Sequence, residues 1–323
     1  ELKDASNHTG SKCTTIVVET YQGIYYEELL DGFGDIFQPD QLIDASEILY
    51  DEQKIREITQ PDVTDHRIFG YMTRLHMTDL LDPEKLEQVQ ESIRDTSSGL
   101  IVIFGYGASI VCPQPDLLIY ADMARWEIQL RMRANEVNNL GIRNMEEHIE
   151  AMYKRGYFVD WRICDRLKKE TMEQWDYVLD TNDPGSPKLI TGNALREGLK
   201  QAAAQPFSVV PLFDPGPWGG QWMRERFDLD EEPENFAWCF NCIPEENSLL
   251  LGFGNTLFEI PSINLVFYRS KELLGDAVHA RFGDEFPIRF DFLDTMAGGN
   301  LSLQVHPLTE YIQDQFGMHY TQD

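Results

Sequence analysis

An alternation of short, continuously apolar runs with amphipathic helical segments in the first half of the chain is the strongest constraint on its fold. The apolar runs lie at residues 14–18, 100–104 and 117–119, and helical spacing follows or separates them. Strands that are buried on both faces of a sheet are apolar throughout, whereas half-exposed strands alternate. The pattern therefore predicts an α/β domain with a parallel sheet covered by helices.

The composition changes in the second half of the chain. Prolines and glycines are frequent between residues 206 and 225, after a predicted helix at residues 191–204. Short alternating runs then follow, as is typical of an antiparallel β domain. These runs lie at residues 249–251, 257–260, 263–268, 287–292 and 301–305. We therefore expect an α/β domain at residues 1–205, a connection at 206–225 and a β domain at 226–323.

The charge of the chain limits its partners. It contains 27 Lys and Arg against 55 Asp and Glu, a net charge of −28. Nucleic acids and anionic membrane surfaces attract basic proteins, so neither is an expected partner. Five cysteines are a sparse, odd number for 323 residues, and no apolar run approaches the ~20 residues of a membrane span. We expect a reduced, cytoplasmic protein in an oligomeric state that the sequence does not define.

One motif near the end of the chain carries candidate metal ligands. It reads Asn-Leu-Ser-Leu-Gln-Val-His-Pro from Asn300 to Pro307. Residues two apart in a strand point to the same face, so Gln304 and His306 are expected to project together. An amide oxygen and an imidazole nitrogen are ligands that suit Zn²⁺ or a similar divalent ion. The alternative interpretation is a half-buried strand with two polar residues on its solvated face.

The same motif resembles the signature of class I mannose-6-phosphate isomerases, which are cupin-fold enzymes. Residues 286–294, an apolar run that ends in Leu-Asp, and the Glu-Tyr pair at residues 310–311 also resemble this family. The resemblance implies that residues 226–323 are the front part of an antiparallel cupin, or jelly roll, with Gln304 and His306 as zinc ligands. It also implies a metal-dependent isomerase that interconverts mannose 6-phosphate and fructose 6-phosphate.

Several parts of such an enzyme's site are missing from the sequence. The family's remaining ligands, a Glu and a further His, would follow Asp323, so we expect little isomerase activity from residues 1–323 alone. No catalytic base is identified, because the nearby carboxylates Asp294 and Glu310 are better explained as a turn cap and a solvated residue. The partners that the resemblance implies are a phosphorylated sugar and Zn²⁺.

The first domain is similar in architecture to nucleoside and nucleotide kinases, with a strand at residues 16–18, then a loop and a helix, and an Arg-rich helix further on. A phosphate-binding P-loop needs Gly-x4-Gly-Lys-[Ser/Thr], so that backbone amides and a Lys meet the phosphates. Residues 19–26 read Glu-Thr-Tyr-Gln-Gly-Ile-Tyr-Tyr, without a second Gly or a Lys. The resemblance implies a degenerate kinase-like domain, with a possible anion site at Arg125, Arg131 and Arg133.

These features leave two functions open. The first is the isomerase activity described above. The second is a non-catalytic regulatory module, in which the kinase-like domain binds a nucleotide or sugar phosphate and the β domain is structural. Zinc content and isomerase activity, and the loss of both in a His306→Ala variant, would separate the two.

Three further motifs have less specific interpretations. Cys239 and Cys242 form a C-x2-C pair, but no second pair completes a zinc site, so buried free thiols are favoured. Residues 105–109 follow a strand, as a dinucleotide-binding loop does, but they lack the third Gly. The Pro-Trp-Gly-Gly-Gln-Trp run at residues 217–222 fits a sugar pocket and close packing equally well.

Overall fold

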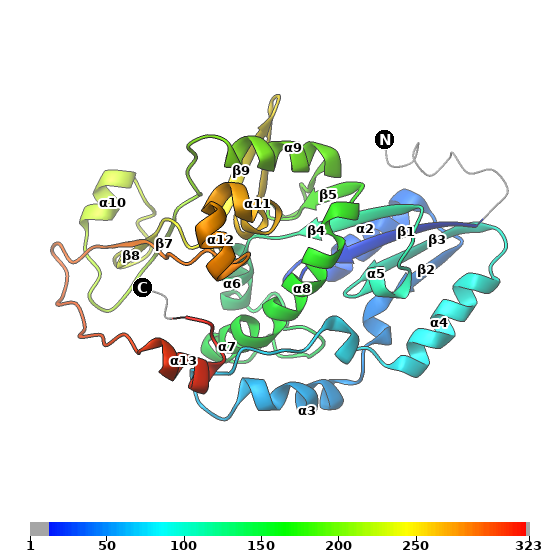
Figure 1. The fold of residues 1–323 in the computed structure, drawn as a ribbon, viewed down its shortest axis with the longest axis horizontal. Coiled ribbons are helices and arrows are strands. Elements are labelled where there is room, and N and C mark those ends of the chain that lie inside the picture. Colours follow the sequence, from blue (N-terminus) through cyan, green and yellow to red (C-terminus); the bar gives the residue numbers. More distant parts are fainter. Residues whose placement is uncertain (1–12, 321–323) are drawn as a thin grey trace. The chain divides into compact units, whose positions relative to one another are not determined.

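The computed structural model describes residues 13–320 (Figure 1), so the ends of the two predicted domains, residues 1–12 and 321–323, lie outside the described residues. The described chain divides into two units. Unit 1 contains residues 13–123, 127–195 and 315–317, and unit 2 contains residues 124–126, 196–314 and 318–320. Each unit is described by itself. Between residues 13 and 320, no helix combines the length and the apolar character needed to cross a bilayer.

Unit 1 is built on a six-stranded sheet with the order β2-β3-β1-β4-β5-β6. Its strands are β1 (Cys13–Thr20), β2 (Gln41–Asp44), β3 (Gly99–Gly105), β4 (Leu117–Asp122), β5 (Tyr177–Asp180) and β6 (Lys188–Thr191). The first five strands are parallel, and β6 pairs antiparallel with β5. Val17 at the centre of β1 is in register with Ile103 of β3 and Leu118 of β4. The predicted parallel α/β sheet is confirmed.

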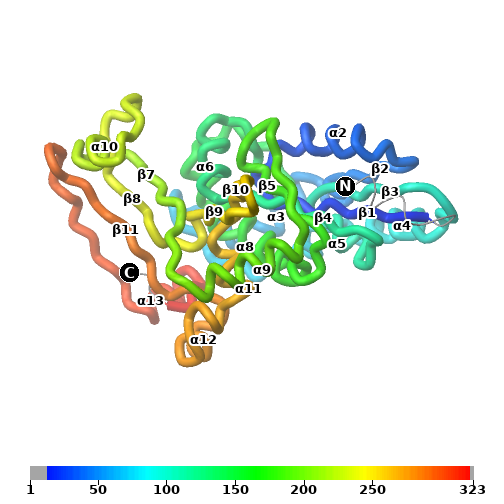
Figure 2. The backbone as a smooth tube through the Cα atoms, turned by 90° about the horizontal axis from the view of Figure 1, so that it is seen from above, coloured from blue at the N-terminus to red at the C-terminus, as the bar shows by residue number. Residues whose placement is uncertain are grey.

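Helices cover both faces of this sheet. Figure 2 shows α2 on one face, and α5 and α8 on the other. The helical elements of this part of the chain are α2 (Tyr26–Phe37), η1 (Ala45–Ile48), α3 (Glu52–Val63), η2 (Met77–Asp79), α4 (Pro83–Asp95), α5 (Ala108–Val111), α6 (Arg125–Arg133), α7 (Ile149–Arg155), the π-helical turn η3 (Gly156–Asp160), α8 (Trp161–Thr171), η4 (Met172–Gln174) and α9 (Gly192–Ala203). The start of α6 and most of α9 belong to unit 2. Because helices lie on both sides, the central strands have no solvated face, which explains their unbroken apolar sequence.

The core and the helix starts follow from the residue types. Ile16, Val17 and Val18 of β1 have no solvent-exposed surface, and the same is true of the residues at 102–104 in β3. Asp82 caps α4, since its carboxylate accepts a hydrogen bond from the backbone amide of Glu84 at 3.0 Å. Caps of this kind satisfy amides that have no partner within the helix.

Unit 2 contains two small antiparallel sheets. One has the order β11-β8-β7, and the other is the hairpin β9-β10. Its elements are β7 (Leu212–Asp214), α10 (Trp222–Phe227), β8 (Trp238–Phe240), β9 (Ser248–Phe253), β10 (Thr256–Pro261), α11 (Ile263–Leu274), α12 (Asp276–Phe282), β11 (Asp291–Leu293) and most of α13 (Thr309–Phe316). Antiparallel strands are therefore present as predicted. Among the described residues they pair as these separate sheets and not as a jelly roll.

Two strand predictions in this part of the chain are wrong. Residues 263–268 form the start of α11, and residues 301–305 have no regular secondary structure. A short apolar run does not distinguish a strand from a buried helix, and the first four residues of α11 are indeed buried. For residues 301–305, no strand of the described chain pairs with the segment.

The Pro-Trp-Gly-Gly run packs closely inside unit 2. The Asp294 carboxylate accepts hydrogen bonds from the amides of Met223, at 2.8 Å, and Met296, at 2.9 Å. A Cβ atom at Gly220 would collide with this carboxylate, and one at Gly219 would collide with the side chain of Asn235. The two glycines thus allow the backbone to approach these polar side chains, which favours packing over a sugar pocket. Asp294 has the capping role that the sequence suggests.

Asn247 organises a second part of unit 2. Its side chain is 1% exposed and makes four hydrogen bonds to the backbone. Its Nδ2 donates to the carbonyls of Val210 at 2.8 Å and Phe240 at 2.9 Å. Its Oδ1 accepts from the amides of Cys242 at 3.2 Å and Ile243 at 2.7 Å. One amide side chain therefore joins the end of β8 to the turn that follows it and to residue 210.

We predict that an Asn247→Leu variant loses about 3 kcal/mol of unfolding free energy, because four half-buried backbone groups lose this partner, and each buried group left unsatisfied costs about 1–3 kcal/mol. Urea unfolding of the full chain measures this loss. The control is Asn300→Leu at an exposed position, which should change stability by less than about 0.5 kcal/mol. Equal stability of the two variants would contradict the role of Asn247.

Candidate functional site

The carboxyl ends of β1 and β4 form the topological switch point of the sheet in unit 1. From β1 the chain continues to β2, which lies towards one edge of the sheet. From β4 it continues to β5, which lies towards the opposite edge. Ligands of open α/β sheets bind outside the carboxyl ends of the strands at such a point. Residues 21–25, which connect β1 to α2, lie at this position in the chain.

The loop at residues 21–25 is held closed by side chains of unit 1. The hydroxyl of Tyr21 donates to Asp165 at 2.9 Å. The side chain of Gln22 accepts from the indole of Trp161 at 2.8 Å and donates to the carbonyl of Asn138 at 2.6 Å. Tyr21 and Gln22 are both buried. The loop is therefore fixed by contacts within the protein at the position where a P-loop would bind phosphate.

Arg131, a predicted anion-binding residue, also holds this loop. Its guanidinium donates to the carbonyl of Gly23 at 3.1 Å and to those of Thr181 and Asn182 at 2.9 and 3.2 Å. Its Nε bonds Glu127 at 3.1 Å, and the side chain is 1% exposed. Backbone carbonyls and a carboxylate thus engage the guanidinium.

The other two predicted anion-binding residues lie at the ends of α6. Arg125, its first residue, is 1% exposed, and Arg133, its last, is exposed. The three arginines therefore differ in their access to solvent. An anion site that they share stays a prediction.

Glu19 ends β1 with a buried carboxylate. Its Oε1 accepts from the amide of Gly107 at 2.8 Å, and its Oε2 accepts from the amide and hydroxyl of Ser109 at 2.8 and 2.7 Å. Burial raises the pKa of Glu19 to about 7, while the hydrogen bonds from Ser109 and Gly107 oppose the rise. The glycine-containing turn at residues 105–109 thus directs its amides to an internal carboxylate, as a dinucleotide-binding loop directs them to phosphate.

A buried ion pair lies at the end of β4. The ammonium group of Lys168 is 2.8 Å from the carboxylate of Asp122, and both side chains are at most 1% exposed. The ammonium group also lies 4.4 Å from the centre of the Tyr21 ring and 5.6 Å from that of Tyr120. Both interactions favour a positive charge on Lys168. This lysine is therefore neutralised within the protein.

A pocket of about 830 Å³ lies beside the closed loop, at the start of α2. Four tyrosines, four glutamates and one arginine contribute to its lining, together with smaller polar and apolar residues. These nine residues are Tyr25, Tyr26, Tyr50, Tyr106, Glu27, Glu28, Glu52, Glu136 and Arg143. A volume in this range suits a small-molecule ligand.

Hydrogen bonds fix two of the tyrosines. The Tyr25 hydroxyl donates to Glu136 at 2.6 Å, and the Arg131 guanidinium lies 4.0 Å from the centre of the Tyr25 ring. The Tyr26 hydroxyl donates to Asp44 at 2.5 Å. Burial and the Asp44 carboxylate raise the pKa of Tyr26 far above its ordinary value, so its hydroxyl remains a neutral donor.

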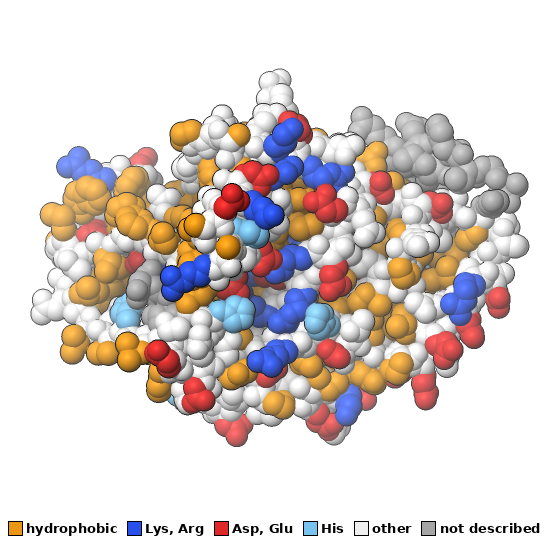
Figure 3. Space-filling model, in the orientation of Figure 1, with side chains coloured by type: hydrophobic (Ala, Val, Ile, Leu, Met, Phe, Trp, Pro, Cys, Tyr) orange, Lys and Arg blue, Asp and Glu red, His pale blue; other side chains and the backbone are white. Residues whose placement is uncertain are grey.

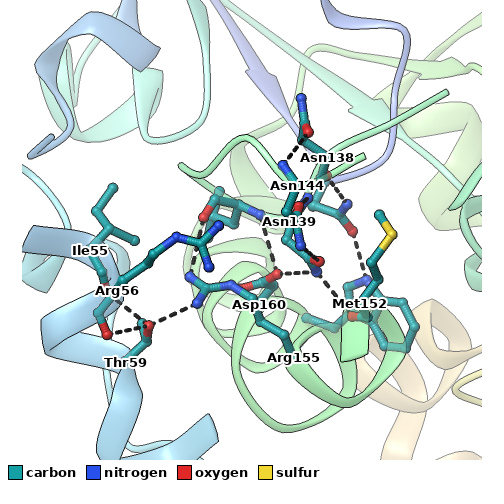
Figure 4. A network of polar contacts seen from close by, with 12 residues as sticks. Ile55, Arg56, Thr59, Asn138, Asn139, Asn144, Met152, Arg155 and Asp160 are labelled. Carbon is teal, nitrogen blue, oxygen red and sulfur yellow. Dashed lines mark hydrogen bonds and ion pairs between the residues drawn. The ribbon is translucent and has the colours of Figure 1, made fainter. Parts of the chain in front are cut away.

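An asparagine-rich network supports one wall of the pocket (Figure 4). Asn139 donates to the carboxylate of Asp160 at 2.6 Å, and Asn144 donates to Asn139 at 2.8 Å. Arg155 lies 3.4 Å from Asp160 and donates to Thr59 at 2.9 Å. Burial raises the pKa of Asp160, and the Arg155 charge opposes this effect. Because these side chains fix the segment at residues 138–144, the wall is formed before any ligand binds.

The predicted metal ligands lie elsewhere, in unit 2. Gln304 and His306 are exposed in a segment without regular secondary structure, next to Leu303 and Val305, which are 95% and 85% exposed. Figure 3 shows hydrophobic side chains gathered on the face of the unit that carries α10. Within residues 13–320, no group of three or more His, Cys, Asp and Glu side chains could hold a metal ion. The zinc site at Gln304 and His306, whose remaining ligands the resemblance places after Asp323, therefore stays a prediction.

The cysteines are free thiols. All five cysteines lie in the described part of the chain, and none forms a disulfide there. Cys239 is buried and Cys242 is half-buried, and burial raises the pKa of both thiols. This agrees with the structural interpretation of the C-x2-C pair. Glu310 lies in the first turn of α13 and is exposed, as the sequence suggests.

Residues 1–204, more than half of the chain, match a family described as a domain of unknown function, DUF8485. The chain belongs to this family. No curated protein sequence matches the chain. The DUF8485 domain therefore includes the closed loop, the pocket and the asparagine network.

Two solved structures that the chain resembles are kinases. The shikimate kinase from Bacteroides thetaiotaomicron is 13% identical, with a TM-score of 0.29, over 54% of this chain and 89% of that one. The phosphoribulokinase from Rhodobacter spheroides is 12% identical, with a TM-score of 0.33, over 84% of this chain and 98% of that one. Both TM-scores are low, so neither kinase indicates the fold or the function of the DUF8485 domain.

The sequence did not identify the residues that line the pocket. Tyr25 and Tyr26 follow Gly23 in the interrupted P-loop, and Tyr106 lies in the glycine-containing turn after β3. Large aromatic residues in loops at the carboxyl ends of parallel strands were the available signal, because ligands bind at these ends. Their side chains come together only through the packing of distant segments.

We predict that the free energy of unfolding decreases as the pH rises, because the buried carboxyl of Glu19 then loses its proton. The folded chain keeps this proton up to about pH 7, whereas the ordinary pKa is 4.5, so the unfolded state gains stability between these values. Relative to a Glu19→Gln variant, the wild type should lose about 2.5 kcal/mol of unfolding free energy between about pH 5 and about pH 8. Urea unfolding of both proteins at each pH measures the difference between their unfolding free energies. The effects of the other titrating groups are the same in both proteins and therefore cancel in this difference.

The matched control is Glu87→Gln, which removes an exposed carboxylate from α4. Its difference from the wild type should not change with pH. A pH-independent difference for Glu19→Gln would show that the buried carboxyl is ionised throughout this range.

Proposed function

We propose that the DUF8485 domain of this chain is a small-molecule-binding module that does not transfer phosphate. The observation that carries the proposal is the combination of a loop after β1 that is fixed by contacts within the protein with a pocket at the start of α2, to whose lining the loop contributes Gly23, Ile24 and Tyr25. The loop is where a phosphotransferase of this architecture would bind its nucleotide. The pocket offers space for a ligand beside it.

The chemistry of the closed loop argues against phosphoryl transfer. That reaction needs donors that cradle the phosphates and a cation that neutralises the charge developing on them. Here Arg131 donates to the Gly23 carbonyl, and Lys168 pairs with Asp122. The amides of Gly107 and Ser109 already bind Glu19. These four residues therefore direct their donors or charges to groups of the protein.

The pocket has the properties of a binding site. It has the volume of a small-molecule site and combines aromatic rings with many polar and charged side chains that could orient a ligand. The asparagine network holds its wall in place, and this reduces the ordering cost of binding. These two properties are the ones that binding of a small molecule requires.

The isomerase activity implied by the motif at residues 300–307 stays a prediction. Gln304 and His306, its two metal ligands in this interpretation, are exposed. Zinc analysis of the purified chain and of a His306→Ala variant tests this activity separately from the pocket.

We predict that soluble fragments from a diverse library bind the DUF8485 domain, while the protein neither hydrolyses ATP nor transfers its phosphate. In NMR spectra of isoleucine-methyl-labelled protein, binding should shift the signals of Ile24 and Ile142, which line the pocket. The signals of core residues such as Ile16 should remain unchanged.

A pocket-filling variant serves as the critical comparison. Met145→Trp places a larger side chain in the lining and should weaken fragment binding at least about tenfold, since about 1.4 kcal/mol of lost binding energy has this effect. Leu130→Trp, at an exposed position outside the lining, should bind as the wild type does. Two results would contradict the proposal. One is ATP turnover by the wild type that the Met145→Trp variant lacks, and the other is that no fragment shifts the signals of Ile24 and Ile142.

A further inference from the structure

We infer that the pocket at the start of α2 binds an organic cation, namely an amine or quaternary ammonium compound with an apolar or aromatic group. This inference rests on the proposed binding function and names the class of ligand. It follows from three properties of the pocket: the charge of its lining, the aromatic rings that it presents, and the carboxylates at the start of α2.

The lining has an excess of negative charge. It contains four glutamates and one arginine, so its formal charge is 1 − 4 = −3. Glu52 is partly compensated by Arg56, 2.9 Å away, and Glu136 accepts a hydrogen bond from the neutral Tyr25 hydroxyl. An ammonium group that enters the pocket is attracted to these carboxylates, since opposite charges near a protein surface interact favourably over several ångströms.

Glu27 and Glu28 are the carboxylates that face least competition. Both are exposed in the first turn of α2, and neither forms a hydrogen bond or ion pair with another residue between 13 and 320. A ligand that supplied a positive charge here would therefore not need to displace an existing partner. It would also relieve the repulsion between two neighbouring negative charges.

The aromatic lining suits the same ligand. The face of a tyrosine ring carries partial negative charge and attracts cations. Tyr25 already binds a cation in this way, because the Arg131 guanidinium lies 4.0 Å from its centre. Tyr26 and Tyr106 lie together, with ring centres 5.2 Å apart, and Tyr50 is a further half-buried ring of the lining. Rings combined with carboxylates bind the charge and the apolar part of an organic cation together.

The same arrangement disfavours a phosphate. A helix N-terminus attracts anions through its free amides, and α2 begins in this pocket. Glu27 and Glu28 in the first turn cancel that attraction with two full negative charges. Arg143 is the single basic residue of the lining, and the chain as a whole carries a charge of −28. A sugar phosphate or nucleotide would therefore meet net repulsion in this pocket.

A matched series of probes tests the inference. Benzylammonium, benzyl alcohol and benzoate share one ring and one size, but carry charges of about +1, 0 and −1 near neutral pH. In methyl NMR titrations, benzylammonium should shift Ile24 and Ile142 with an affinity at least about tenfold higher than that of benzyl alcohol. Benzoate should shift neither signal.

Charge-removing variants locate the effect in the pocket. The double variant Glu27→Gln, Glu28→Gln should reduce the preference for benzylammonium from about tenfold to about twofold, since the nearby charges supply most of it. The control, Asp31→Asn with Asp35→Asn, removes the same charge from exposed positions of α2 outside the lining. This control should keep the full preference, because charges outside the pocket act at longer range and are screened by salt.

The outcomes separate this inference from the proposed function. If benzyl alcohol or benzoate binds as tightly as benzylammonium, or if the library yields only neutral or anionic ligands, the inference of an organic cation is wrong. The proposed small-molecule-binding function is then retained. If the control variant loses the preference for benzylammonium as fully as the glutamate variant does, the preference arises from the overall charge of the protein. The inferred cation site in the pocket is then wrong. If no probe or library fragment shifts Ile24 and Ile142, the binding function itself fails.

Discussion

A charged side chain in the interior of a protein needs a partner within hydrogen-bonding distance, and unit 1 meets this requirement at the carboxyl ends of its two central strands. Glu19 at the end of β1 is held by the amides of Gly107 and Ser109, and Asp122 at the end of β4 is held by Lys168. In other open sheets a ligand binds at this position. Here groups of the protein itself bind one another at this position, and the loop after β1 is fixed beside them by Asp165, Trp161 and Asn138.

The closed loop determines where a ligand has access. Because Tyr21 and Gln22 are fixed by Asp165, Trp161 and Asn138, the open space lies beyond them, at the start of α2. The contact to Asn138 also joins the loop to the opposite wall. The side chains that fix this loop thus take part in shaping the neighbouring pocket.

The sequence predicted the sheet well and the site poorly, for physical reasons. Continuous apolar runs such as residues 14–18 occur in strands buried on both faces, and the Asp82-Pro83 pair begins a helix through local hydrogen bonds. Such signals act over a few residues. The apolar run at residues 263–268 has no side-chain cap of this kind, so its sequence predicted a strand where the structure has the helix α11. The bond between Glu19 and Ser109 joins residues 90 positions apart, and the pocket likewise depends on packing between distant segments that local patterns do not reveal.

The exposed segment at residues 301–308 gives the charge of the chain a second role. Leu303 and Val305 project their side chains into solvent, and among the described residues no strand pairs with their backbone. Exposed apolar side chains of two protein copies tend to associate. A charge of −28 opposes this by repulsion between copies, which extends about 10 Å at 0.1 M salt and about 3 Å at 1 M. The colloidal stability of the protein is therefore set by ionic strength, and concentrated salt favours self-association through this segment.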